Sequence, residues 1–255
     1  MGWRPKIGKK LLNPKNADTQ QLMYRVIPHA FAKFMSHYFR IQVEGVENIP
    51  SQGAALITPN HSGFSGFDAF LLGHQIENHT KRKPCILTHK LWFAADATAK
   101  PMHNLGFVEA NKQNGLEALE RKELVVLFPE GELGNFKPSS KAYHLQEFKR
   151  GFIRMALEKQ CPIVPTLILG AEETHINLAR FKLKKYLPGT ILPLPFNIIP
   201  LPAKWHILFM EPIYLPYTAR EAKNQELVRE LAAEIRETMQ TRLSHEVSLR
   251  KNLYF

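Results

Sequence analysis

The stretch that decides the fold is residues 54–76, which read AALITPNHSGFSGFDAFLLGHQI. Its first five residues form a short apolar run, typical of a buried strand. A polar loop with two glycines follows, and from Asp68 to Ile76 the apolar residues recur at helical spacing. A strand, a loop and a helix in this order predict the first unit of an α/β fold.

The same alternation continues along the rest of the chain. The expected strands are 54–58, 85–88, 124–128, 163–169 and 204–210, and the expected helices are 68–76, 91–99, 115–122, 148–159 and 218–243. We therefore expect an α/β architecture with a largely parallel central sheet flanked by helices. In such sheets, sites form at the carboxyl ends of the strands, where Asn60-His61 and Glu130-Gly131 would lie.

The first 40 residues differ from the rest and are expected to form a basic, amphipathic segment before a single domain at 41–255. A helix is expected over 18–40, with a kink at Pro28. One side of it carries Met23, Ile27, Phe31, Phe34, Met35 and Tyr38. Packing on the domain's own core is the favoured interpretation, and contact with a bilayer interface is the alternative.

A second apolar segment, residues 186–202, carries five prolines among Leu, Ile and Phe. Prolines at this density exclude a continuous membrane-spanning helix. Two interpretations remain open: a loop that contacts a membrane or an acyl chain, and a rigid, partly buried crossover.

The charge balance indicates an anionic partner. Lys and Arg outnumber Asp and Glu by 34 to 23, which gives a formal net charge of +11. No nucleic-acid recognition pattern accompanies this charge, so we expect no nucleic-acid partner and favour an anionic membrane or substrate.

Cysteine and histidine usage gives no support for metal binding. The two cysteines, Cys85 and Cys161, lie in apolar runs and are expected to be buried free thiols. No zinc-ligand spacing occurs, and the basic N-terminus lacks the apolar region of a secretory signal. We therefore expect a cytoplasmic protein, in peripheral contact with the cytoplasmic face of a membrane.

The loop at 60–68 contains the residues for proton transfer. His61 can remove a proton from an alcohol while Asp68 fixes the imidazole tautomer and stabilises its cation. Asn60 and Ser62 flank the histidine and are expected to bind the substrate. Asp68 can instead cap the helix that begins there, and both roles can coexist.

A serine nucleophile is not supported in this loop. The esterase elbow Gly-x-Ser-x-Gly would need glycine at position 67, where Phe67 stands. Without an enzyme nucleophile, the substrate's own hydroxyl is the natural group for His61 to deprotonate.

A second polar turn, Phe128-Pro129-Glu130-Gly131, ends the strand expected at 124–128. A polar substrate could be held at Glu130. The nearby cations, which could attract a phosphate, are Lys137, Lys141, Lys149 and Arg150.

Three blocks resemble, in order and spacing, those of the glycerolipid acyltransferase superfamily, which includes lysophosphatidic acid acyltransferases. The blocks are Asn60-His61 with Asp68 downstream, Phe128-Pro129-Glu130-Gly131, and Pro162-Ile163-Val164-Pro165-Thr166. The resemblance covers roughly residues 40–215. It implies that His61 is the general base, that Asp68 is its charge partner, and that Glu130 and Gly131 bind the acceptor.

The resemblance also implies further substrate contacts. Val164, Pro165 and Thr166 correspond to the block beside the acyl-donor site. Gly106-Phe107-Val108 resembles the block before an acceptor-binding basic residue, for which Lys112 is the candidate.

Two departures bear on the acceptor. Six residues separate His61 from Asp68, where four are usual; this longer form looks like members grouped with mono- and diacylglycerol acyltransferases. The arginine usual after Glu-Gly is also missing, because Glu132-Leu133 follows Gly131.

We expect an O-acyltransferase that moves a fatty acyl group from acyl-CoA or acyl carrier protein to a glycerolipid hydroxyl. The acceptor would be lysophosphatidic acid, another lysophospholipid, or mono- or diacylglycerol, and no cofactor is expected. The alternatives are a non-catalytic lipid-binding or transfer protein and a lipid esterase.

Overall fold

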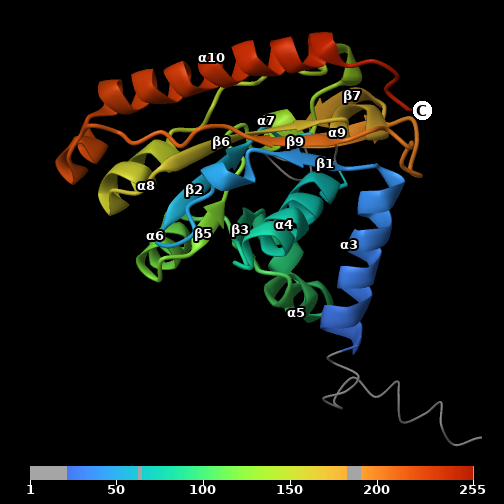
Figure 1. The fold of residues 1–255 in the computed structure, drawn as a ribbon, viewed down its shortest axis with the longest axis horizontal. Coiled ribbons are helices and arrows are strands. Elements are labelled where there is room, and N and C mark those ends of the chain that lie inside the picture. The colour runs from blue at the N-terminus through green and yellow to red at the C-terminus, as the bar shows by residue number, and fades with distance from the viewer. Residues whose placement is uncertain (1–21, 63–64, 183–190, 255) are drawn as a thin grey trace, which may run out of the picture.

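The computed structural model describes residues 22–62, 65–182 and 191–254. They form three layers, in which a seven-stranded sheet lies between two layers of helices (Figure 1). The strands are β1 (Gln42–Glu44), β2 (Ala55–Pro59), β3 (Cys85–Thr88), β4 (Phe107–Glu109), β5 (Leu124–Val126), β6 (Ile163–Leu169) and β9 (His206–Phe209). Their order is β1-β9-β6-β2-β5-β3-β4, and all neighbours run parallel except β6 and β9. The expected largely parallel α/β sheet is confirmed.

Helices cover both faces of the sheet and enclose two apolar cores. One face is covered by α6 (Lys112–Glu120), α8 (Gly151–Lys159) and α10 (Gln225–Leu249), and the other by α3 (Ile27–Tyr38), α4 (Phe67–Thr80) and α5 (Asp96–Asn104). Figure 1 shows α10 above the sheet and α3, α4 and α5 below it. Because both faces are covered, the central strands β2 and β6 are buried along their whole length.

Short helices complete the described chain. They are the π-helix η1 (Leu22–Val26), the α-helices α7 (Glu132–Asn135) and α9 (Ala171–Thr174), and the 3-10 helices η2 (Val46–Asn48), η3 (Lys90–Phe93), η4 (Ser139–Lys141) and η5 (Ala219–Lys223). The helix expected at 91–99 is thus η3 followed by α5, and the strand expected at 124–128 ends at Val126. Cys85 and Cys161 are free and buried as expected, and burial raises the pKa of each thiol to about 11.

The N-terminal helix only partly packs on the core. Of the residues expected at 18–40, 18–21 lie outside the described residues, and α3 begins at Ile27 with Pro28 in its first turn, where proline is tolerated. Met35 is buried, as the favoured interpretation requires, but Met23, Ile27, Phe31 and Phe34 are exposed. Burial in the core is therefore wrong for these four side chains.

Part of the proline-rich segment forms a strand, which neither of the two open interpretations, a contacting loop and a rigid crossover, predicted. Residues 186–190 lie outside the described part, but β8 (Ile191–Pro195) pairs antiparallel with β7 (Asn177–Lys182) in a separate two-stranded ribbon. Each strand of such a ribbon has one unpaired edge, where proline costs no ladder hydrogen bond. In the described residues, no helix has the length and hydropathy needed to cross a bilayer.

Candidate active site

Three loops meet at one edge of the sheet, because β2 lies between β5 and β6 and runs parallel to both. Asn60 and His61 follow β2, Glu130 lies beyond β5, and Glu172 lies beyond β6. Parallel neighbours present their carboxyl ends at the same edge, so these polar residues come together there.

His61 and Asp68 are in direct contact. The imidazole Nδ1 lies 2.5 Å from Asp68 Oδ2, which also accepts the Ser62 backbone N–H at 2.9 Å, and Asp68 Oδ1 accepts the Ala69 N–H at 2.8 Å. Asp68 is fully buried, while 14% of the His61 side chain is exposed. A carboxylate at Nδ1 favours the tautomer that leaves the lone pair on Nε2, which is the form a general base needs.

Asp68 does not occupy the capping position that we had considered. Gly66 is the N-cap of α4, with a left-handed φ of 74°, and Asp68 is the second residue of the helix. The turn at Gly66 confirms the expected role of glycine in bringing Asp68 back to His61. Gly63 lies outside the described residues. Asp68 still serves the helix, since Ala69 is one of its otherwise unpaired first-turn donors.

Phe128 fixes the plane of the imidazole. Its ring centroid lies 4.1 Å from that of His61, with 32° between the planes. The next residue, Pro129, accepts the Lys149 backbone N–H at 2.8 Å, which ties the turn to the start of α8. The turn expected to bind substrate thus also supports the histidine ring.

Glu130 anchors the His61 loop through a hydrogen bond to the loop backbone. Its carboxylate is fully buried; Oε1 accepts the His61 backbone N–H at 2.9 Å and Oε2 accepts the Gln146 backbone N–H at 2.7 Å. We expected Glu130 to contact the acceptor, but protein atoms enclose it. Gly131 turns the chain away with φ 57° and ψ −144°, and a Cβ there would lie 2.7 Å from Lys149 Nζ.

Lys137 joins this buried network and is not a surface phosphate ligand, which corrects our expectation. Its ammonium lies 2.8 Å from Glu172 Oε1 and 3.8 Å from Glu130 Oε2, and only 3% of its side chain is exposed. Burial raises the pKa of Glu172 to about 7, even though Lys137 opposes the shift. The Lys137 ammonium is therefore the shared counterion of two buried carboxyl groups.

Asn60 and the block at 164–166 form the frame of the site. Asn60 donates from Nδ2 to the Ile168 carbonyl at 3.0 Å and accepts the Ile168 N–H at 2.7 Å. Val164, Pro165 and Thr166 are buried in β6, where Thr166 accepts the Asn60 backbone N–H. These residues hold β2 and β6 in register, and their contact with an acyl donor stays a prediction.

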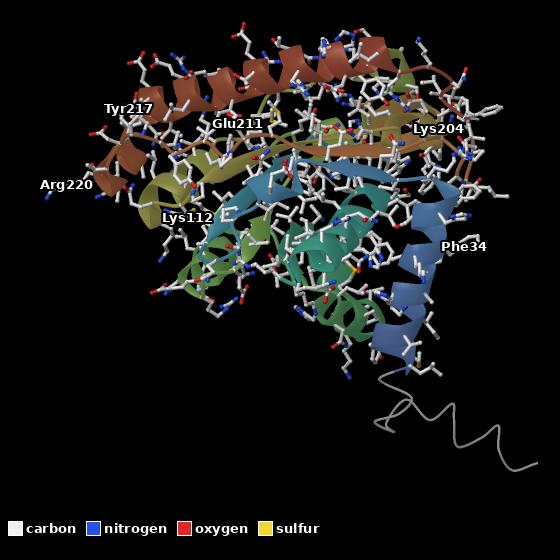
Figure 2. All side chains as sticks on the ribbon, viewed as in Figure 1. Phe34, Lys112, Lys204, Glu211, Tyr217 and Arg220 are labelled. Carbon is white, nitrogen blue, oxygen red and sulfur yellow. The ribbon has the colours of Figure 1, made fainter. Side chains whose placement is uncertain are left out.

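Lys112 is not part of this network, and its contact with an acceptor stays a prediction. Its ammonium lies 2.6 Å from Glu158 Oε1 where α6 crosses α8, and 58% of its side chain is exposed. Figure 2 shows Lys112 at the outer surface of the molecule.

Sequence reasoning missed Glu172 and the polar cluster behind it. Glu172 Oε2 accepts the Tyr143 backbone N–H at 3.0 Å, and Arg250 Nη1 lies 2.5 Å from Glu173 Oε1 and donates to the Tyr143 hydroxyl at 2.7 Å. Glu172 follows the strand expected at 163–169. The expectation that sites form at the carboxyl ends of parallel strands, which pointed to Glu130, would therefore have pointed to Glu172 as well.

Glu130→Gln is expected to lower the free energy of unfolding by about 1–3 kcal/mol, because a side-chain amide nitrogen would then face one of the two buried N–H donors. Urea unfolding measures this loss. Glu132→Gln is the matched control: that carboxylate is 35% exposed and pairs with His89, so its change should stay within about 0.5 kcal/mol. Equal effects of the two substitutions would contradict the anchoring role.

Comparisons with known proteins relate this geometry to a family. Residues 40–169 match the Acyltransferase family. An uncharacterized protein of Mycobacterium leprae is 35% identical over 235 residues, which cover 87% of this chain and 64% of the relative. An uncharacterized protein of Mycobacterium tuberculosis strain H37Rv is also 35% identical, over 87% of this chain and 66% of the relative. The chain thus spans just under two thirds of the length of these curated relatives.

A solved structure shares the fold. The crystal structure of the 1-acyl-sn-glycerophosphate acyltransferase PlsC from Thermotoga maritima superimposes with a TM-score of 0.59 over 96% of this chain and 88% of that chain, at 16% identity. The family match includes His61, Asp68 and Glu130 and about half of the chain. The chain belongs to the Acyltransferase family, which confirms the acyltransferase resemblance that its ordered blocks indicated.

Proposed function

We propose that this protein transfers a fatty acyl group from acyl-CoA or acyl carrier protein to a hydroxyl of a glycerolipid. The observation that carries the proposal is the contact between His61 Nδ1 and Asp68 Oδ2 at the carboxyl edge of the sheet. An imidazole held by a buried carboxylate is suited to take a proton from an alcohol. The family match supports acyl transfer as the reaction class.

In the proposed mechanism, His61 Nε2 removes the proton of the acceptor hydroxyl while the hydroxyl oxygen attacks the carbonyl carbon of the thioester. Asp68 stabilises the imidazolium that forms. The tetrahedral intermediate then collapses, the C–S bond breaks, and the imidazolium returns the proton to the departing thiolate. The products are an ester and a free thiol, and no covalent acyl-enzyme forms.

The chemistry of the site favours acceptors that do not depend on a phosphate contact. Lys137 is already paired with Glu130 and Glu172, and Glu132-Leu133 stand directly after Gly131, where an arginine is usual. We infer that the acceptor is a mono- or diacylglycerol, or a lysophospholipid bound by its glycerol and acyl parts. Because such acceptors reside in bilayers, we also propose peripheral contact with the cytoplasmic face of an anionic membrane.

An assay with radiolabelled acyl-CoA or acyl carrier protein tests the reaction against separate acceptors: lysophosphatidic acid, another lysophospholipid, monoacylglycerol and diacylglycerol. Labelled lipid that appears only with an acceptor is the expected result. Free fatty acid as the sole product would assign hydrolysis, and lipid binding without any product would assign a binding or transfer role.

A further inference from the structure

The β7–β8 ribbon has one exposed apolar face. Its register pairs Phe181 with Leu192 and Ala179 with Leu194, so these four side chains lie on the same side. Phe181, Leu192 and Leu194 are 53%, 44% and 41% exposed. A two-stranded ribbon whose apolar face meets only water is marginal on its own, so a surface that covers this face would stabilise it.

The segment after β8 also exposes large apolar side chains, and it is held in place by hydrogen bonds. Phe196, Ile198 and Ile199 are 72%, 85% and 80% exposed. Between them, Asn197 accepts the Ile176 N–H at 2.8 Å and donates to the Thr174 carbonyl at 3.1 Å. The backbone is therefore fixed in a conformation that presents three large apolar side chains outward.

The exposed side of α3 adjoins this segment. Tyr38 donates its hydroxyl to the Pro200 carbonyl at 2.8 Å, and Phe34 stacks on Tyr38 at 6.4 Å between ring centroids. Phe34 is 62% exposed, and Figure 2 shows it pointing away from the domain. We call the following set the docking surface: Ile27, Phe31 and Phe34 of α3, Phe181, Leu192 and Leu194 of the ribbon, and Phe196, Ile198 and Ile199.

The charge of these two parts of the chain indicates what covers the docking surface. Residues 19–43 and 174–210 contain no Asp or Glu, although the chain has 23. They carry eight cations in the sequence, and the side chains of four of them are described: Lys33, Arg40, Arg180 and Lys204. Large apolar side chains among cations, with no anion, suit the interface of an anionic bilayer, where each well-placed Lys or Arg adds about 1 kcal/mol of attraction.

The docking surface also borders the candidate active site. The Phe31 ring lies 6.2 Å from Phe67 and 6.1 Å from Phe70. Phe67 directly precedes Asp68 in α4, so Phe31 packs against the first turn of the helix that carries Asp68.

We propose that the docking surface inserts its apolar side chains into the interface of an anionic phospholipid bilayer. The inference rests on the membrane contact of the proposed function, which it assigns to particular side chains, and vesicle binding is measured separately from acyl transfer.

Sedimentation with vesicles tests the contact. The double variant Ile198→Ser/Ile199→Ser removes two side chains that make few contacts in the protein. Wild type should bind phosphatidylcholine vesicles that contain phosphatidylglycerol, and this binding should weaken at high salt. The variant should bind the same vesicles at least about tenfold more weakly.

Tyr214→Ser is the control, because Tyr214 is 69% exposed but lies outside the docking surface. It stands three residues before Tyr217, and Figure 2 shows Tyr217 at the opposite end of the molecule from Lys204 and Phe34. The Tyr214→Ser variant should bind like wild type.

The outcomes separate this inference from the proposed function. Equal vesicle binding by wild type and the double variant, or no binding by either, would overturn the docking surface even if acyl transfer is observed. A wild-type dimer in light scattering that the double variant abolishes would assign the surface to a second copy of the chain and also overturn it. Conversely, vesicle binding that depends on Ile198 and Ile199, in a protein that transfers no acyl group to any acceptor, would uphold the surface and overturn the proposed function.

Discussion

His61→Ala is expected to lower the kcat of acyl transfer by about 10²- to 10⁴-fold, which is the contribution of a positioned general base. The loss follows from the removal of the imidazole that Asp68 and Phe128 hold in place. The substituted protein should still fold, because alanine keeps the backbone N–H that donates to Glu130. Acyl transfer from labelled acyl-CoA measures the effect, with circular dichroism as the check on folding.

A histidine remote from the site provides the control for this substitution. His245 lies on α10 with 62% of its side chain exposed, so His245→Ala should leave kcat within about twofold of wild type. A folded His61→Ala protein that keeps more than about a tenth of the wild-type rate would show that His61 is not the base.

Asp68→Asn is expected to lower kcat by about 10²-fold or more, with a smaller effect on stability. In the orientation in which the asparagine oxygen accepts the Ala69 N–H, its amide nitrogen takes the place of Oδ2 and faces both His61 Nδ1 and the Ser62 N–H. The imidazole must then accept a hydrogen bond at Nδ1 and carry its proton on Nε2, where it can no longer act as a base. Steady-state kinetics measures the rate loss.

Parallel urea unfolding separates the two roles of Asp68. Loss of a charged acceptor for buried N–H donors should lower the free energy of unfolding by about 1–3 kcal/mol. A stability loss of this size with an unchanged kcat would assign Asp68 to the helix start alone and remove it from the proposed mechanism.

The parts of the fold that were predictable from sequence depend on local patterns. The apolar run at 54–58 and the helical spacing after Asp68 placed β2 and α4, and the glycines between them indicated a turn that closes the seven-position separation. The approach of His61 to Asp68 followed from these signals, since the two residues flank one short loop.

The inward direction of Glu130 and Lys137 was not predictable in this way. A Pro-Glu-Gly turn is compatible with a carboxylate that points outward or inward, and its partners here, the backbone N–H groups of His61 and Gln146, come from distant parts of the sequence. The ribbon was missed for a related reason: prolines argue against a central strand, but both strands of a two-stranded sheet have a free edge.

The buried arrangement of Glu130, Lys137 and Glu172 constrains how the chain can evolve. Loss of the ammonium alone would leave the Glu130 carboxylate without a counterion in the protein interior and would force Glu172, whose pKa is already raised to about 7, to take up a proton. Removal of one partner of a buried ion pair costs about 3–5 kcal/mol. Single substitutions at position 137 should therefore be eliminated by selection, whereas coordinated replacement by uncharged residues is tolerable. We expect these positions to covary among homologous sequences, so that a neutral residue at 137 accompanies a neutral residue at 172.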